Sequence, residues 1–136
     1  MGETSFSIKS KASDRELVFS APRSDYFTVE LRGAGVGALR NVYAYTDASG
    51  LAKFFQRLAA YERPWVEPER WESLEGEFSI EAICSVLGEV RFCLRIRDLF
   101  GGPEEWEVRA NLVTELGQLA GIAFRAKSFF NVVASA

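Results

Sequence analysis

Apolar and polar residues alternate over most of three stretches, 71–84, 89–97 and 106–113, and this pattern limits the fold more than any other feature. Successive side chains of a strand point to opposite faces of a sheet, so a period of two residues indicates strands with one buried face. We therefore predict a three-stranded antiparallel meander. Its buried face is predicted to consist of Leu74, Gly76, Phe78, Ile80, Ala82, Cys84, Val90, Phe92, Leu94, Ile96, Trp106, Val108, Ala110 and Leu112.

The register of the first hairpin follows from the same pattern, because residues that face each other on paired strands must lie on one face of the sheet. A three-residue turn, Val86-Leu87-Gly88, meets this condition and places glycine at a left-handed position. It pairs Ile80 with Leu94 and Glu77 with Arg97.

The second hairpin is predicted to pair Ile96 with Trp106, which places Arg95 opposite Glu107. The outer face of the meander then becomes a ladder of acidic, basic and acidic strands. Each exposed pair of opposite charges in such a ladder contributes about 0.2–1 kcal/mol.

Four further strands are predicted before the meander, from alternating or apolar runs at 6–9, 16–20, 26–32 and 36–45. The glycine-rich segment 33–37 indicates a hairpin turn between the last two of them. A phosphate-binding loop would need a helix directly after it, whereas the residues that follow have strand character.

Two amphipathic helices are predicted, one after the fourth strand and one at the end of the sequence. The first begins after N-cap residues at 46–49, ends before Pro64 and carries the apolar stripe Leu51, Phe54, Phe55 and Leu58. The second spans about 115–133, with Thr114 as its cap. Its apolar stripe consists of Leu119, Ile122, Ala126, Phe129, Phe130 and Val133.

These elements predict an α+β fold in the order ββββ-α-βββ-α. A mainly antiparallel sheet of about seven strands would bury its apolar face under the two helices. The chain has 136 residues, the size of one ordinary domain, so we expect a single domain over 1–136.

The sequence contains no histidine, which removes Ser-His-Asp and Cys-His nucleophiles and the usual zinc sites. Only Cys84 and Cys93 could bind a soft metal, and the predicted register puts them on opposite faces, so we predict no disulfide between them. Glu75, Glu77 and Glu81 lie on one face at a strand spacing that falls within the separations of glycosidase carboxylates, but arginines face them and hold the carboxylates ionised. We expect no cofactor, no metal and no enzymatic activity.

Charge and hydropathy narrow the class of partner. A formal net charge of −3 disfavours nucleic-acid binding, because a phosphate backbone attracts basic surfaces. No apolar run approaches the roughly 18 residues of a membrane-spanning helix, and the first residues lack the hydrophobic segment of a signal peptide. The sequence therefore predicts a cytoplasmic protein without a membrane or nucleic-acid partner.

Three hypotheses for function remain open, beside the alternative that the charged sheet face is only solvated. The first is a non-enzymatic protein-binding domain that uses the outer face of the meander. The second is a small-molecule or enzymatic domain with a pocket near Tyr43, Tyr45 and Trp65. The third is a homodimer that associates through exposed aromatic residues. Candidate residues for the first are Trp71, Glu75, Glu77, Arg91, Arg95, Arg97 and Glu107.

Several segments together resemble a bacterial family of small proteins of unknown function. The most recognisable are Trp71-Glu72-Ser73-Leu74-Glu75-Gly76, Trp106 and the terminal helix that begins at Gly117-Gln118-Leu119. The family is similar in layout to immunity proteins of the wall-associated-toxin (WapI-like) type. This resemblance covers nearly the whole chain and implies a compact α+β domain that binds and neutralises a toxin. It implies no catalytic residues.

Overall fold

The computed structural model describes residues 4–44 and 50–135, with side chains up to Asn131 in the last helix. Its strands form two antiparallel four-stranded sheets, in the orders β1-β2-β3-β4 and β5-β6-β7-β8. The elements follow one another as β1 (Ser5–Lys9), β2 (Glu16–Ser20), β3 (Tyr26–Gly33), β4 (Val36–Tyr43), α1 (Gly50–Ala59), β5 (Glu69–Glu72), β6 (Phe78–Cys84), β7 (Glu89–Asp98), β8 (Trp106–Glu115), the 3₁₀ helix η1 (Leu116–Gln118) and α2 (Leu119–Ser135).

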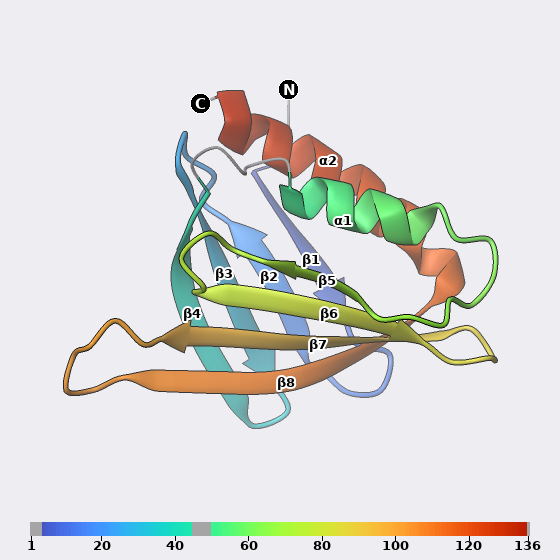
Figure 1. The fold of residues 1–136 in the computed structure, drawn as a ribbon, viewed down its shortest axis with the longest axis horizontal. Helices are drawn as coiled ribbons and strands as arrows, with labels where there is room; N and C mark the ends of the chain where they lie inside the picture. The colour runs from blue at the N-terminus through green and yellow to red at the C-terminus, as the bar shows by residue number, and fades with distance from the viewer. Residues whose placement is uncertain (1–3, 45–49, 136) are drawn as a thin grey trace.

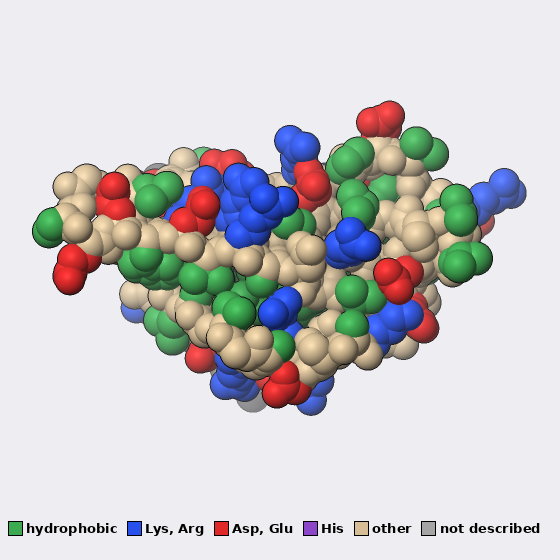
Figure 2. All heavy atoms as spheres, turned by 90° about the horizontal axis from the view of Figure 1, so that it is seen from below, with side chains coloured by type: hydrophobic (Ala, Val, Ile, Leu, Met, Phe, Trp, Pro, Cys, Tyr) green, Lys and Arg blue, Asp and Glu red, His purple; other side chains and the backbone are tan. Residues whose placement is uncertain are grey.

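The predicted α+β class and antiparallel pairing are confirmed, but the prediction of one sheet of about seven strands is wrong. The two sheets pack face to face, and α1 and α2 lie together along one side of this sandwich (Figure 1). The opposite side, where β4 and β8 form the sheet edges, carries no helix. Figure 2 views the molecule from that side, and hydrophobic side chains gather between the charged groups there.

The extra strand arises because the stretch predicted as one strand at 71–84 contains a tight turn. Residues 73–77 connect β5 to β6. The amide of Gly76 donates to the Ser73 carbonyl (3.0 Å), and Gly76 adopts a φ of +77°. Leu74, predicted to be buried, is 55% exposed on this turn. From Leu74 onward the alternation of apolar and polar residues runs through the turn and into β6 in one phase, so this part of the pattern did not reveal the turn.

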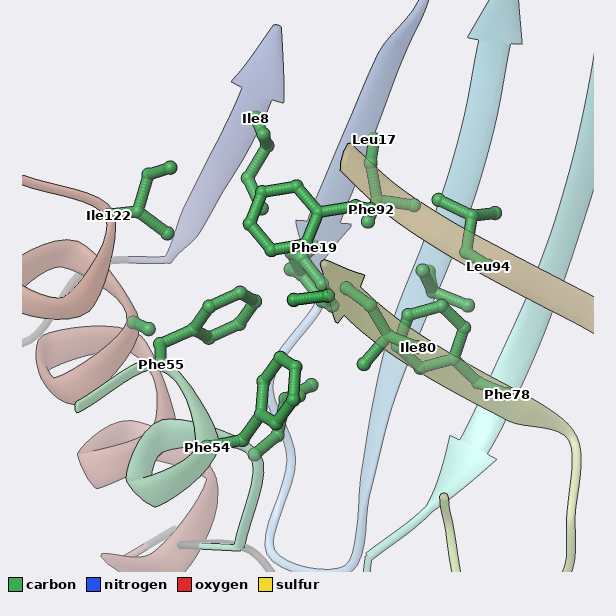
Figure 3. Packing of buried hydrophobic residues seen from close by; sticks show 14 of the residues in the cluster. Ile8, Leu17, Phe19, Phe54, Phe55, Phe78, Ile80, Phe92, Leu94 and Ile122 are labelled. Atoms are coloured by element: carbon green, nitrogen blue, oxygen red, sulfur yellow. The ribbon is translucent and has the colours of Figure 1, made fainter. Parts of the chain in front are cut away.

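A cluster of phenylalanine rings joins both sheets and both helices at the centre of the molecule (Figure 3). Phe19 of β2 is fully buried and stacks on Phe6 of β1 with 4.6 Å between ring centroids. Its ring also contacts Phe78 of β6 at 5.9 Å, so it bridges the two sheets. Its further ring contacts, at 6.0–6.4 Å, are Phe27 of β3, Phe55 of α1 and Phe129 and Phe130 of α2.

Most predicted apolar faces agree with this core. The stripe of α1 is buried, as are the described members of the stripe predicted for the second helix. The side chain of Val133 and the N-cap residues at 46–49 lie outside the described residues. The prediction of Thr114 as a helix cap is wrong, because Thr114 is a buried residue of β8 and the chain turns through η1 before α2 begins.

The first predicted register is confirmed, since Ile80 pairs with Leu94. The second is wrong by two residues, because Ile96 pairs with Val108 rather than Trp106. The cysteines lie on opposite faces, as predicted: Cys84 packs against the core, and Cys93 pairs with outward-facing Glu81.

The glycine-rich hairpin turn between β3 and β4 is also confirmed. Gly33 adopts a φ of +100°, and a Cβ there would lie 2.4 Å from the Asp14 carbonyl oxygen. The Asp14 carboxylate accepts a hydrogen bond from the Ala34 amide (2.8 Å). Glycine is therefore required at position 33 by the close approach of the β1–β2 connection.

Glu77 differs from its predicted position on the exposed face, because its side chain is only 2% exposed. One carboxylate oxygen accepts a hydrogen bond from the Tyr43 amide at the end of β4 (2.8 Å). The other accepts one from the Ser73 hydroxyl (2.8 Å), which in turn accepts the Phe78 amide (3.2 Å). The carboxylate therefore ties the edge of the first sheet to the β5–β6 turn of the second.

Replacing the central ring should strongly destabilise the protein. We expect Phe19→Ala to lower the free energy of unfolding by about 3–5 kcal/mol, through lost apolar burial and the cavity left behind. Urea denaturation followed by circular dichroism measures this. The control is Phe124→Ala, which removes a ring that is 75% exposed and should change the value by no more than about 0.5 kcal/mol. Equal effects of the two substitutions would contradict the central position of Phe19.

Removing the buried carboxylate should also be costly. We expect Glu77→Ala to lower the free energy of unfolding by about 2–4 kcal/mol, because the Tyr43 amide and the Ser73 hydroxyl lose a charged acceptor. The same denaturation measurement applies, with exposed Glu75→Ala on the neighbouring turn as the matched control. A Glu77→Ala protein as stable as the Glu75→Ala protein would show that the carboxylate does not join the sheets.

Candidate functional site: an arginine-lined depression

The outer face of the second sheet carries a depression of about 470 Å³ that crosses all four of its strands. Strand alternation places the side chains of Ser79, Arg95 and Arg109 in one row across β6, β7 and β8. The depression is lined by Arg70, Trp71, Glu72, Ser79, Ile80, Glu81, Cys93, Arg95, Arg97 and Arg109. Four arginines and two glutamates thus surround one hollow on a chain whose overall charge is negative.

Two of these arginines are held by neighbouring side chains. Arg70 forms an ion pair with Glu81 at 2.5 Å. Arg97 donates from Nη2 to the Ser79 hydroxyl (3.1 Å) and lies 3.8–4.0 Å from carboxylate oxygens of Glu107 and Glu72. Its Nε is buried and finds no hydrogen-bond partner among the described residues. Arg97 therefore keeps part of its donor capacity unused beneath the depression.

The other two arginines, Arg95 and Arg109, face each other directly across β7 and β8. Within residues 4–44 and 50–131, neither has a carboxylate at ion-pair distance. Hydrogen bonding to the Cys93 sulfur raises the pKa of Arg109, with further contributions from the Cys93 charge and the more distant charges of Glu107 and Glu81. Like charges directly opposite on paired strands destabilise a sheet. An anionic group placed between the two guanidinium forks would relieve this repulsion and could accept paired hydrogen bonds.

The corrected register explains why this site was not predicted. The predicted pairing gave Arg95 a glutamate partner, Glu107. In the structure Glu107 lies opposite Arg97, and Arg95 lies opposite Arg109. A shift of two residues preserves the faces of the strand, so the alternation does not distinguish the two registers.

The structure brings only some of the predicted partner-binding residues together. Arg95, Arg97 and Trp71 line the depression, and Glu107 lies beside Arg97. Arg91 is exposed on the same face beyond the depression, where it pairs with Ile83 and Val113. The two predicted residues that lie elsewhere are Glu75, exposed on the β5–β6 turn, and Glu77, buried between the sheets.

The lining residues that were not predicted from the sequence are Arg70, Glu72, Ser79, Ile80, Glu81, Cys93 and Arg109. The signal for Arg109 and Cys93 was present, because alternation assigns both to the outer face. Arg70 and Glu72 could have been found only by recognising the turn at Gly76, which makes β5 a separate strand.

Of the residues predicted to line a pocket, Trp65 borders an open hollow formed by residues 60–67, and Tyr43 lies elsewhere. Trp65 is 5% exposed, and its indole N–H donates to the Ala82 carbonyl (3.2 Å), so it closes the core beside β6. Half-buried Tyr43 lies against the ring of Tyr26 at 5.2 Å. Tyr45 lies outside the described residues. The packing of Trp65 favours a surface site over a pocket between sheet and helix.

The exposed side of the Trp65 ring is covered by Tyr61, at 4.8 Å between centroids. The Tyr61 hydroxyl donates to the Glu69 carboxylate (2.6 Å), which lowers the pKa of Glu69 and raises that of Tyr61. Arg57 of α1 also bonds to Glu69 (3.2 Å). This group fastens the segment 60–69 to α1 and stands apart from the arginine depression.

The described residues carry neither a cluster of metal ligands nor a helix suited to a membrane. No group of three or more histidine, cysteine, aspartate or glutamate side chains is placed to hold a metal ion there. In the same part of the chain, no helix is both long and apolar enough to cross a membrane.

Comparison with known proteins gives a family but no activity. The model of a family described as "Family of unknown function (DUF6228)" matches residues 8–133. A comparison with curated proteins found no match.

The facing arginines predict a stability gain on their removal. We expect Arg95→Thr to raise the free energy of unfolding by up to about 1 kcal/mol at low salt, because it removes a like-charge pair and introduces a good strand former. The gain should shrink at 1 M salt, where the screening length falls to about 3 Å. Arg91→Thr on the same strand and face is the control, since its neighbours Ile83 and Val113 are uncharged. A loss of stability specific to Arg95→Thr would contradict uncompensated repulsion.

Proposed function

We propose that this chain, which belongs to the DUF6228 family, is a non-enzymatic binding domain whose arginine-lined depression binds an acidic surface of a protein partner. The observation that carries the proposal is the pair Arg95 and Arg109. They face each other in a hollow on a chain of net charge −3, and among the described residues neither has a carboxylate at ion-pair distance. Repulsion between the two guanidinium groups destabilises the free protein. A ligand that places an anionic group between them would remove this repulsion, which would explain why both arginines are present.

A protein is a better ligand for this surface than a small molecule or a nucleic acid. The hollow lies open across four strands and is bordered by Trp71 and arginines, residue types that are enriched at protein interfaces. Glu72 and Glu81 sit among the arginines and would repel a phosphate backbone. A folded partner can instead place carboxylates against Arg95 and hydrogen-bonding groups against these glutamates.

Binding also fits the chemistry of the site better than catalysis does. Each carboxylate that borders the hollow lies near an arginine: Glu81 at Arg70, and Glu72 at Arg97. Such pairs favour the ionised carboxylate and suit recognition rather than proton transfer. The absence of histidine from the sequence removes the commonest general base.

The resemblance to immunity proteins supplies a specific role for this binding. In that role the partner is a bacterial toxin, and the domain acts in the cytoplasm by covering an acidic part of the toxin surface. The complex would depend strongly on salt, because complementary charges of this kind steer association and are screened by ions.

Charge reversal at one arginine tests the proposal. We expect a partner from a native lysate to bind the immobilised wild-type domain but not Arg95→Glu, which places a carboxylate in the middle of the hollow. Lys127→Glu on α2 changes the charge equally, is exposed and should retain the partner. Quantitative mass spectrometry of the bound fractions measures the ratio, and binding should fall between 50 and 500 mM salt.

A photo-cross-linking residue locates the contact. Substitution of Arg91 by benzoylphenylalanine, at the margin of the depression, should cross-link the same partner, whereas the same group at Phe124 on α2 should not. Retention of the partner by Arg95→Glu, cross-linking only at position 124, or the absence of any retained partner would each contradict the proposal.

A further inference from the structure

Strand β8 is the edge of the second sheet, and the chain itself covers only part of that edge. The Lys11 amide donates to the Val113 carbonyl (2.8 Å), and the Val113 amide donates to the Ser10 hydroxyl (3.2 Å). Arg15 donates to the Asn111 carbonyl (3.0 Å). The β1–β2 connection therefore covers β8 over 111–113, and the first half of the strand remains open.

These contacts reveal which backbone groups of the open half point outward. In an antiparallel sheet, successive residues of an edge strand direct their N–H and C=O groups alternately towards the neighbouring strand and away from it. Val113 and Asn111 direct theirs away from β7, as their bonds to the β1–β2 connection show. By the same alternation, Arg109 and Glu107 present free N–H and C=O groups at the edge.

This open stretch is complementary to itself in charge. If two copies pair antiparallel about a two-fold axis through Val108, the numbers of facing residues sum to 216. Glu107 of each copy would then face Arg109 of the other copy, which gives two such pairs. These are the residues with outward backbone groups, so both pairs would also exchange N–H···O=C bonds. Each Arg109 would gain the carboxylate that no described residue of its own chain brings within ion-pair distance.

The side chains on the inner face of the stretch also need cover. Trp106 and Val108 pack against the core but are only half-buried, because they lie at the open side of the sandwich. Figure 2 shows hydrophobic side chains gathered along this side. A second copy paired along β8 would place Trp106 opposite the small residue Ala110 of its partner. The pairing would end where each copy's own β1–β2 connection begins.

The edge of the first sheet on the same side of the sandwich, β4, lacks these features. The Tyr43 amide points away from β3 and donates to Glu77, and this shows which residues of β4 direct their backbone N–H and C=O groups outward. Its outward residues are therefore Asn41, Leu39 and Gly37, which carry no charge. An exposed edge strand is normally protected or paired, and among the described edges β8 combines free backbone groups with self-complementary charges.

We infer that the protein forms a symmetric homodimer by antiparallel pairing of β8 with β8 of a second copy, centred on Val108. The sheet β5-β6-β7-β8 of one copy then joins the same sheet of the other copy, and together they form one continuous eight-stranded sheet. Arg95 lies on β7, outside this contact, so the inference does not depend on the proposed partner-binding function.

Charge exchange tests the pairing. Sedimentation equilibrium of the wild-type protein should give a dimer, and Glu107→Arg or Arg109→Glu alone should weaken dimerisation about tenfold or more, since each creates like-charge pairs at both symmetric positions. The double variant Glu107→Arg/Arg109→Glu exchanges the partners and should restore dimerisation towards the wild-type value. Circular dichroism confirms that each variant is folded.

A cysteine at the axis gives a second readout. In a background with Cys84→Ser and Cys93→Ser, Val108→Cys should form an intermolecular disulfide on mild oxidation, because residues at a non-hydrogen-bonded pair lie about 4.5 Å apart at Cα. Leu39→Cys, which is exposed on the β4 edge, is the control and should stay largely monomeric on a non-reducing gel. A wild-type monomer up to several hundred micromolar, or a dimer that neither responds to charge exchange nor cross-links at position 108, would overturn the inference.

Discussion

The fold depends on the burial of one ring, Phe19, between two sheets that have no strand in common. Phe19 contacts Phe78 across the sandwich, and it contacts rings from both helices along the side of the sandwich that the helices cover. A four-stranded sheet with one apolar face is unstable in water unless that face is covered, and here each sheet covers the other. Most of the phenylalanines of the chain serve this one cluster, which fixes how the second sheet is oriented and therefore which of its faces is left to solvent.

The elements that could be predicted were those whose pattern is set by local geometry. Alternation identified the strands around Phe78, Phe92 and Leu112 and assigned their buried faces, because the period of two follows from the strand itself. It failed at Gly76, since the alternation that begins at Leu74 runs in one phase through the tight turn into β6 and so hides where β6 begins. It also misplaced Glu77, whose partner, the Tyr43 amide, belongs to the other sheet and is distant in sequence.

The register of β7 and β8 shows why charge pairing was a poor guide. The observed register pairs every residue of 89–98 with one of 106–115, whereas the predicted register, which also placed Arg97 opposite Glu105, would pair only 89–96 with residues of β8. Each additional ladder hydrogen bond contributes about 0.5–1.5 kcal/mol. An exposed charge pair contributes about 0.2–1 kcal/mol, and the observed register keeps one such pair, Arg97 with Glu107. The hydrogen bonds gained by pairing both strands along their full length therefore outweigh the charge pairs of the predicted register. The juxtaposition of Arg95 and Arg109 is a consequence of this pairing.

The two proposed contacts meet at Arg109. This guanidinium borders the depression and also lies on the open edge of β8, where Glu107 of a second copy would face it. An acidic group of a protein partner and that glutamate would compete for the same donors, whereas Arg95 would remain available to the partner in either state. Because coupling between two binding events is reciprocal, a partner that engages Arg109 would weaken the dimer to the same extent that the dimer weakens partner binding. A partner that binds through Arg95 and Arg97 alone would leave the dimer intact. The position of one side chain on the last strand thus decides whether the two interactions of this sheet are independent or opposed.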